Sequence, residues 1–523
     1  MRRKAAGVVF AALLVSCGGG GGGGGNPAPA PPSGPTFAAE STLAARCASP
    51  RSGTDPLTGM PYPDRQGSLL DEQNWLASWT NDLYLWFDQV SYGIPANYPT
   101  AIDYFNVLKT NATTPSGKPV DRFHFTYPTA VWEALSQSGV QAGYGAVWSL
   151  VSGTPPRLVE VAYTEPNSPA TNLSPPLARG ATVLAVDGVD INDNTQAGVN
   201  SLNAGLFPAG ANESHTFFVQ DLTGSQRSIT LVSANVDTTP VQNVGVISGT
   251  TTGYMLFNDH LASAEPALIS AVTTLQAAQI TDLVIDIRYN GGGYLAIASE
   301  LAYMIASPTV TGGKTFELTQ FNSKHPTVDP VSGMTITPLP FLSTSQGFTA
   351  SPAAGTPLPH LDLARVVVLT GPGTCSASES IMNSLRGIGV TVIQVGSTTC
   401  GKPFGFYPAD NCGTTYFSIQ FRGVNASGFG DYQDGFAPQN APVPVAAAAT
   451  LPGCSVYDDF SHALGDPNEA RLAAALSYLA SNLTGSACPT PSGLGAPAGV
   501  RRFWAADGRV VKSPFLSNRI LRH

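Results

Sequence analysis

The sequence predicts a mixed α/β protein that contains a helical segment, a small all-β module and a larger α/β domain. Short apolar runs, which are typical of buried parallel strands, alternate with segments of helical periodicity and predict the α/β domain. The runs are residues 283–287, 365–369 and 390–395, and the helical segments are 266–279, 295–307 and 376–385. Val-containing runs between turn residues, from 139 to 236, predict the β module.

Length and charge narrow the class of protein. A chain of 523 residues exceeds the ~100 to 200 residues of a usual domain, so more than one folded unit is expected. The net charge is −9, whereas binding to DNA or RNA phosphates requires an excess of Lys and Arg. We therefore expect no nucleic-acid partner.

The first seventeen residues are typical of an export signal. Basic residues 2–4 precede an apolar run from Ala5 to Val15. Leu14-Val15-Ser16-Cys17 resembles a bacterial lipobox, in which Cys17 is lipidated and becomes the mature N-terminus. Residues 18–65, which begin with a run of glycines, are predicted to be a Gly/Pro-rich tether. We expect an exported lipoprotein of the cell envelope, anchored to the membrane through Cys17; a plain secretory signal is the alternative.

Six cysteines follow Cys17, at positions 47, 375, 400, 412, 454 and 488. Export places them in an oxidising compartment, so one to three disulfides are expected, and the sequence leaves their pairing open. The chain contains no Cys-x-x-Cys pair and no cluster of histidines. We therefore expect no metal site and no cofactor.

Residues 66–138 are predicted to form an N-terminal helical segment. Ser68 followed by Asp71 is similar to a capping box, and Trp75, Trp79, Leu83 and Trp86 recur at helical spacing. An aromatic stripe of this kind indicates core packing rather than a ligand site.

The β module, residues 139–236, resembles a PDZ domain. Ser168-Pro169-Ala170 and the run from Val183 to Gly188 match the pattern of that family, although Ala181 stands where an acidic residue is usual. By this resemblance, Gly143-Tyr144-Gly145 is the loop that binds the terminal carboxylate of a peptide, and the peptide binds by strand addition.

The α/β domain, residues 237–480, contains two glycine-rich turns at the carboxyl ends of predicted strands, where parallel sheets bind ligands. Residues 288–293 form one turn and residues 371–376 the other. Ser376 lies where the second turn meets a helix, so backbone N–H groups and the helix dipole favour negative charge that develops beside its hydroxyl. A helix-capping serine is the alternative.

Lys402 is a candidate partner for Ser376. It is the only lysine between His325 and Val511, and it follows the next predicted strand. A step between neighbouring strands of one sheet would bring the two residues together. No acid lies among Gly401 and residues 403–406, which suits a desolvated amine of lowered pKa that acts as a general base. A solvated surface lysine is the alternative.

Three ordered motifs resemble the C-terminal (tail-specific) processing proteases, serine peptidases with a Ser-Lys dyad. They are the Asp-Ile-Arg-Tyr-Asn-Gly-Gly-Gly run at 286–293, Ser376-Ala377-Ser378-Glu379, and the run from Gly396 to Lys402. The resemblance covers roughly residues 70 to 480 and implies a crotonase-like α/β core. It also implies that Ser376 is the nucleophile, that Lys402 is the base, and that the amides of Ala377 and of Gly292 or Gly293 form the oxyanion hole.

One position departs from the family pattern. Phe406 stands where a Gln usually follows the lysine by four residues, so the group that orients Lys402 is open; Glu379 is a candidate because it is close in sequence. The expected function is a serine endopeptidase that cleaves exported proteins or peptides through an acyl-enzyme.

The sequence leaves two other functions open. The alternatives to the peptidase are a catalytically silent peptide-binding lipoprotein and a Ser-His-Asp hydrolase, for which His360 is the nearest histidine before Ser376. The basic tail, residues 489–523, is expected to be flexible; contact with an acidic surface of its own domain or with anionic lipid is the alternative.

Overall fold

The computed structural model describes residues 37–55, 58–134, 136, 139–150, 155–441, 448–481, 483, 488–489, 509–511 and 519–520. The predicted lipobox with Cys17 and the run of glycines lie outside the described residues. Within the described ranges, no helix combines the length and the apolar character that crossing a membrane requires.

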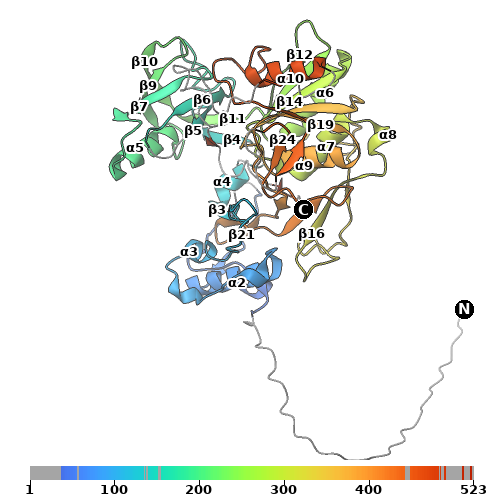
Figure 1. Ribbon diagram of the computed structural model, residues 1–523. Coiled ribbons are helices and arrows are strands. Elements are labelled where there is room, and N and C mark those ends of the chain that lie inside the picture. The colour runs from blue at the N-terminus through green and yellow to red at the C-terminus, as the bar shows by residue number, and fades with distance from the viewer. Residues whose placement is uncertain are drawn as a thin grey trace, which may run out of the picture. The chain divides into compact units, whose positions relative to one another are not determined.

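The α/β domain is built on a six-stranded sheet (Figure 1). Its order is β12-β13-β14-β18-β19-β26, and all neighbours are parallel except β12 and β13. The strands are β12 (Val241–Val246), β13 (Thr252–Phe257), β14 (Asp282–Asp286), β18 (Arg365–Thr370), β19 (Thr391–Gly396) and β26 (Gly453–Ser455). The three strands predicted from apolar runs are therefore present, and they are consecutive neighbours in the sheet.

Helices cover both faces of this sheet because its central strands are apolar on both sides. On one face, Ile285 and Val368 share a core with helices α6, α7 and α9, and on the other Val284 and Val367 share a core with α10. Successive side chains of a strand point to opposite faces, so a strand buried on both sides is a continuous apolar run in the sequence. The helices are α6 (Ala264–Ala277), α7 (Leu295–Ile305), α9 (Ala377–Gly387) and α10 (Ala470–Ala480).

A second sheet forms partly from residues 308–360, where the sequence indicates only irregular structure. That expectation is wrong, because β16 (Thr315–Phe321) pairs with β17 (Leu339–Pro340) and with β23 (Phe421–Val424). With β20 (Phe404–Gly405) the order is β17-β16-β23-β20. The partner β23 is distant in sequence, and strand formation depends on such neighbours more than on intrinsic propensity. The short helix α8 (Pro308–Thr311) precedes β16.

The module expected at 139–236 has a sheet of order β10-β9-β7-β6-β5-β27. The expectation of an all-β module is wrong, because it includes helix α5 (Gln196–Leu206), whose N-cap Thr195 accepts a hydrogen bond from the Gly198 amide. The strands are β4 (Val140–Gly143), β5 (Ala146–Leu150), β6 (Val159–Thr164), β7 (Thr182–Val186), β8 (Val189–Asp190), β9 (Ser214–Gln220), β10 (Gln226–Val232) and β11 (Ala234–Asp237). The strand β27 (Arg509–Val511) comes from the C-terminal tail.

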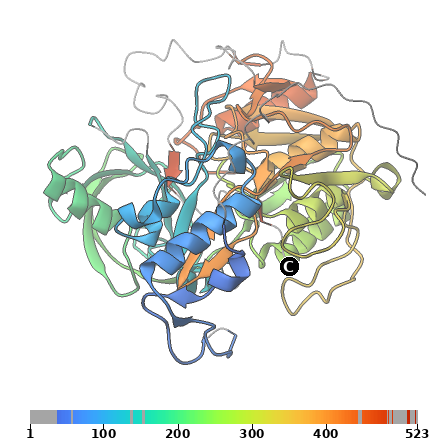
Figure 2. The same cartoon turned by 90° about the horizontal axis from the view of Figure 1, so that it is seen from below.

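The predicted tryptophan helix is α2 (Leu69–Leu83), the long blue helix of Figure 2. The capping box is confirmed, since Ser68 Oγ accepts from the Asp71 amide and the Asp71 carboxylate accepts from the Ser68 amide. Trp75 and Trp79 are buried and stack with their ring centroids 5.5 Å apart. Trp86 lies beyond the helix and packs edge-on against Phe404, so its assignment to the helical stripe is wrong.

The tether predicted for residues 18–65 is wrong in its C-terminal part. The Glu40 carboxylate accepts a hydrogen bond from Trp75 Nε1 at 3.0 Å, and Cys47 is buried and disulfide-bonded to Cys412. The elements from 37 to 138 are α1 (Glu40–Leu43), β1 (Arg46–Cys47), β2 (Arg65–Gln66), η1 (Phe87–Gln89), η2 (Pro95–Asn97), α3 (Ala101–Phe105), β3 (Phe125–Pro128) and α4 (Thr129–Glu133), in addition to α2.

The N-terminal segment shares a sheet with the α/β domain. Strand β3 pairs with β22 (Thr414–Phe417), which pairs with β21 (Ala409–Asn411). The remaining strands are β15 (Gly293–Tyr294), β24 (Phe436–Pro438), β25 (Ala449–Leu451) and, in the tail, β28 (Arg519–Ile520). The six cysteines form three disulfides, Cys47–Cys412, Cys375–Cys400 and Cys454–Cys488.

Candidate active site

The two glycine-rich turns meet at the carboxyl ends of β14 and β18. These strands are parallel neighbours, so the turns that follow them emerge at the same edge of the sheet. The Cys375 amide and Ser378 Oγ both donate to the Asn290 carbonyl, each at 3.1 Å. The residue before Ser376 and the residue two after it are thus fastened to the turn that contains Gly292 and Gly293.

Ser376 has an unusual backbone and a buried hydroxyl. It occupies the N-cap position of α9 with φ 61° and ψ −117°, a region that non-glycine residues rarely adopt. Its Oγ is buried and, among the described residues, has no partner at full hydrogen-bond geometry, although Ser376 and Glu379 are arranged as a capping box in which this oxygen faces the Glu379 amide. The capping arrangement agrees with the helix-capping alternative, whereas the strained backbone is of the kind that clusters at functional sites.

Lys402 lies on the loop after β19, the neighbour of β18 in the sheet. The expected step between neighbouring strands is therefore present. The disulfide Cys375–Cys400 joins the residue before Ser376 to the loop of Lys402. Ser376 and Lys402 are both fully buried.

Glu379 links these two loops through its carboxylate. Oε2 accepts from the Ser376 amide at 3.0 Å and from the Lys402 amide at 2.8 Å. Oε1 accepts from Thr399 Oγ1 at 2.5 Å and from the Gly401 amide at 2.8 Å. Burial raises the pKa of the Glu379 carboxyl above its ordinary value, and these hydrogen bonds oppose the shift. Glu379, the candidate for the group that orients Lys402, thus contacts the backbone amide of Lys402.

The amine of Lys402 lies against two aromatic rings. Its Nζ is 4.7 Å from the ring centroid of Phe123 and 4.8 Å from that of Phe406, the residue that departs from the family pattern. Phe123 belongs to the N-terminal segment, before β3. Phe123 could not be predicted from the sequence, because nothing in its local sequence connects it with a lysine so distant along the chain.

The predicted oxyanion residues lie at the start of α9 and in the first glycine-rich turn. Ala377 is the first residue of α9. The Gly292 amide donates to Asn290 Oδ1 at 2.9 Å, so Gly293 is the better candidate of the two glycines. Gly293 has φ 143°, and a Cβ there would lie 2.5 Å from the His260 carbonyl oxygen, so only glycine fits.

The predicted peptide-binding loop lies in the other module, at the start of β5. Tyr144 is buried, and its hydroxyl donates to the Gly205 carbonyl at 2.9 Å. Gly145 has φ 71°, and a Cβ there would collide with Ser168 at 2.1 Å. A largely apolar pocket of about 230 Å³ lies between β5 and α5, lined by residues that include Trp148, Leu150 and Leu202.

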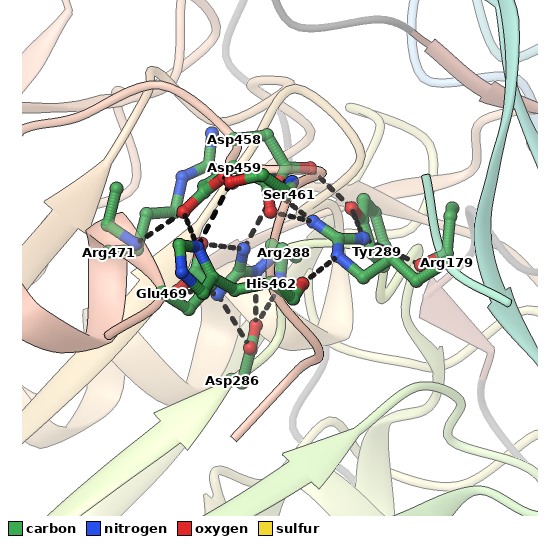
Figure 3. A network of polar contacts seen from close by, with 12 residues as sticks. Arg179, Asp286, Arg288, Tyr289, Asp458, Asp459, Ser461, His462, Glu469 and Arg471 are labelled. Atoms are coloured by element: carbon green, nitrogen blue, oxygen red, sulfur yellow. Dashed lines mark hydrogen bonds and ion pairs between the residues drawn. The ribbon is translucent and has the colours of Figure 1, made fainter. Parts of the chain in front are cut away.

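Behind the first turn lies a buried network of charged groups that the sequence analysis missed (Figure 3). Arg288 donates to Asp286 Oδ1 at 2.9 Å, to Asp458 Oδ1 at 2.7 Å and to Glu469 at 2.8 and 3.0 Å. Arg179, from the 139–236 module, donates to Asp458 Oδ1 at 2.6 Å. The arginines hold the pKa of Asp458 well below its usual range, despite burial. The network fixes the turn after β14 and ties the two modules together.

Two histidines bear on the Ser-His-Asp alternative. His360, the candidate from the sequence, pairs with Asp362 at 2.9 Å and is a third exposed. His260 is buried, and its Nδ1 lies 3.0 Å from Asn290 Oδ1. His260 thus adjoins the glycine turn, and sequence reasoning did not single it out.

The described residues contain a single group of potential metal ligands, Cys375, Glu379 and Cys400. The two cysteines are bonded to each other, so neither offers a thiolate. While the disulfide is formed, the donors of this group do not suit a metal ion.

Residues 251–406, which include both turns, Ser376 and Lys402, match the model of peptidase family S41. The fold is similar to a crystal structure from Bacteroides fragilis NCTC 9343 assigned to the S41 proteases, with a TM-score of 0.57, 20% identity, and 81% of this chain and 98% of that chain covered. A photosystem II D1 C-terminal processing protease aligns with a TM-score of 0.41, 18% identity, and 73% and 92% covered. No curated protein matches the sequence.

Proposed function

Residues 251–406 make this chain a serine peptidase of family S41, a hydrolase, and from this premise we propose that it is an endopeptidase of the C-terminal processing type. In this proposal Ser376 is the nucleophile and Lys402 the general base. The observation that carries the proposal is the buried Ser376 Oγ, which has no partner at full hydrogen-bond geometry among the described residues and is held in a strained backbone at a helix N-terminus.

The proposed reaction uses the lysine twice. Ser376 Oγ attacks the scissile carbonyl carbon while Lys402 Nζ accepts the hydroxyl proton. The C–N bond then breaks, the lysine returns that proton to the leaving amine, and an ester of Ser376 remains. Water adds to the ester with the same lysine as base, which releases the new carboxyl group and restores the hydroxyl. The amides of Ala377 and Gly293 stabilise the oxyanion in both halves.

A lysine base must be neutral before it can accept the proton. Complete burial favours the neutral amine, because the charged form loses its hydration. The rings of Phe123 and Phe406 restrict where the amine lies, and Glu379 holds the backbone of both loops. In our proposal these two rings orient Lys402 in the place of the missing Gln.

The 139–236 module is proposed to be PDZ-like and to bind the C-terminus of the polypeptide substrate. Two features support this role: the Gly143-Tyr144-Gly145 loop at the start of β5, and the apolar pocket between β5 and α5. Strand addition on β5 would supply main-chain hydrogen bonds. The charged pair of Arg179 and Asp458 couples this module to the turn beside the nucleophile.

We also propose that the protein is exported and anchored through a lipid on Cys17. The sequence of residues 1–17 supports the signal, and the three disulfides fit an oxidising compartment. Substrates would then be exported proteins or peptides.

The decisive experiment compares hydrolysis of casein and of peptides with a free C-terminus by four chains: wild type, Ser376→Ala, Lys402→Ala and the double variant. Each single variant should lose activity, and the double should be hardly worse, because the two residues act as one unit. Lys324→Ala is the matched control, since that lysine also lies against an aromatic ring, 4.2 Å from the Phe87 centroid. A wild-type chain that cleaves nothing but binds the peptides would favour the silent peptide-binding protein.

A further inference from the structure

The C-terminal tail adds a strand to the module that is proposed to bind peptides. Strand β27 pairs with β5 in antiparallel fashion, with Arg509 opposite Leu150, Val510 opposite Ser149 and Val511 opposite Trp148. Without β27, β5 would be an edge of the sheet, because its other neighbour is β6. An exposed strand edge is the surface on which an extended peptide docks by strand addition.

The direction of β27 is the direction that a substrate C-terminus would take. As the tail runs from Arg509 to Val511, its partners run from Leu150 back to Trp148, toward the start of β5. The Gly143-Tyr144-Gly145 loop lies immediately before that start. Trp148 and Leu150 also line the apolar pocket of about 230 Å³.

The same tail returns beside the candidate oxyanion glycine. Strand β28 pairs in parallel with β15, so that Arg519 is opposite Gly293 and Ile520 is opposite Tyr294. It also lies next to β20, the strand that follows Lys402 by two residues. Ser376, Lys402 and Gly293 are all buried, so a substrate can reach them only when a covering segment moves.

Charge favours the docking of this segment on its own chain. Residues 489–523 contain Arg501, Arg502, Arg509, Lys512, Arg519 and Arg522 against the single acid Asp507. The chain as a whole has a net charge of −9. A basic tail is therefore attracted to the acidic remainder of the molecule.

We propose that the C-terminal tail is an intramolecular competitor of the substrate. In this state β27 occupies the strand-addition edge of the 139–236 module and β28 lies along the strand of Gly293. The proposal deepens the proposed function and rests on it, because it identifies the segment that blocks the peptide site. A polypeptide substrate must displace the tail before Ser376 can attack it.

The size of the effect follows from the fraction of free sites. If the tail is bound nine-tenths of the time, the apparent affinity for substrate falls about tenfold, because only the free fraction can bind. Binding is intramolecular, so a weak contact suffices to reach this occupancy. Once substrate is bound the chemistry is unchanged, so the tail should raise KM and leave kcat alone.

The test uses full-length chains with a proline in β27. Neighbouring N–H groups of a strand point to opposite sides, so Val510→Pro or Val511→Pro removes a donor that faces β5. At least one of the two should lower KM about tenfold with kcat within about twofold of wild type. The matched control is Val500→Pro, the same change outside both strands, and it should behave as wild type. The idea is overturned if KM is the same in all four chains.

A second measurement separates this proposal from the proposed function. A fluorescent peptide of residues 505–523 is titrated into the Ser376→Ala chain with and without the effective proline. Loss of the tail contact should tighten peptide binding about tenfold even if no chain hydrolyses any substrate. Equal peptide affinities would refute the competitor while leaving a measured Ser-Lys activity intact. Absence of hydrolysis with a tenfold shift in affinity would refute the enzyme and retain the competitor.

Discussion

Glu379→Gln should inactivate the enzyme through its backbone contacts, although the side chain is not proposed to touch substrate. Each carboxylate oxygen accepts two hydrogen bonds: Oε2 from the amides of Ser376 and Lys402, and Oε1 from Thr399 Oγ1 and the Gly401 amide. A glutamine has one carbonyl oxygen and one NH2 group. At the position of Oε2 the NH2 group faces two amide donors and satisfies neither; at the position of Oε1 it leaves the Gly401 amide unsatisfied, whereas the Thr399 hydroxyl can turn and accept from it.

The magnitude follows from these lost bonds. A hydrogen bond to a charged group contributes about 1.5–3 kcal/mol, so the loss of one or two of them costs roughly 1.5–6 kcal/mol. Part of this cost is avoided if the two loops move apart. A displacement of about 1 Å between reacting groups lowers the rate on the order of a hundredfold. We therefore expect kcat to fall at least about a hundredfold, together with a loss of stability.

The assay measures kcat and KM for peptide hydrolysis, with Tm from circular dichroism. Glu72→Gln is the matched control, because that carboxylate accepts a single amide, from Ala48 at 2.8 Å, and should change neither quantity much. A Glu379→Gln chain with wild-type kcat and wild-type Tm would refute the reasoning. A lower Tm with an unchanged kcat would show that the carboxylate is structural only.

Three further predictions concern the groups around the site. Replacing Cys375 and Cys400 together by alanine should cost about 3 kcal/mol in urea unfolding and also lower kcat, because the disulfide joins the two catalytic loops; a kcat that stays at the wild-type value would show that the sheet alone aligns them. Arg288→Ala should lower the free energy of unfolding by about 3–5 kcal/mol because it leaves buried carboxylates without their partner, whereas Arg365→Ala, at a partly exposed ion pair, should lower it by at most about 1 kcal/mol; similar losses for both would contradict a special role of the buried network. Burial and a neighbouring carboxylate raise the pKa of Glu300 to about 9, so the folded state holds a proton that the unfolded state loses above pH 4.5, and stability should fall as pH rises from there toward 9. Glu300→Gln should reduce that slope in Tm measured against pH, most clearly between pH 7 and 9, because Glu160, whose pKa burial raises to about 7, contributes only at lower pH; an unchanged slope in that range would contradict it.

Local patterns were sufficient where the structure depends on near neighbours. The apolar runs predicted β14, β18 and β19, because a strand buried on both faces needs apolar side chains at every position. The capping box at Ser68 was visible because both partners lie within one helical turn. The order of strands and turns also brought Ser376 and Lys402 to neighbouring loops.

Contacts between distant parts of the chain were not predictable in this way. Strand β16 was missed because its partner β23 is remote in sequence. The role of Glu379 was only suggested, since closeness in sequence did not show that its carboxylate binds backbone amides of both loops. Trp86 has the helical spacing of the stripe, but the helix ends at Leu83.

The sequence by itself determined the α/β class, the strands of the central sheet, and the candidate roles of Ser376 and Lys402. These depend on periodicity, turn residues and motif order, which are properties of short segments. The tertiary structure decided the pairing of the cysteines, the rings beside the lysine, the Arg288 network and the return of the tail to β5 and β15. Each of these contacts joins two segments that are distant in the sequence. Burial of apolar surface and complementary charge stabilise such contacts only in the folded chain, so no short stretch of sequence predicts them.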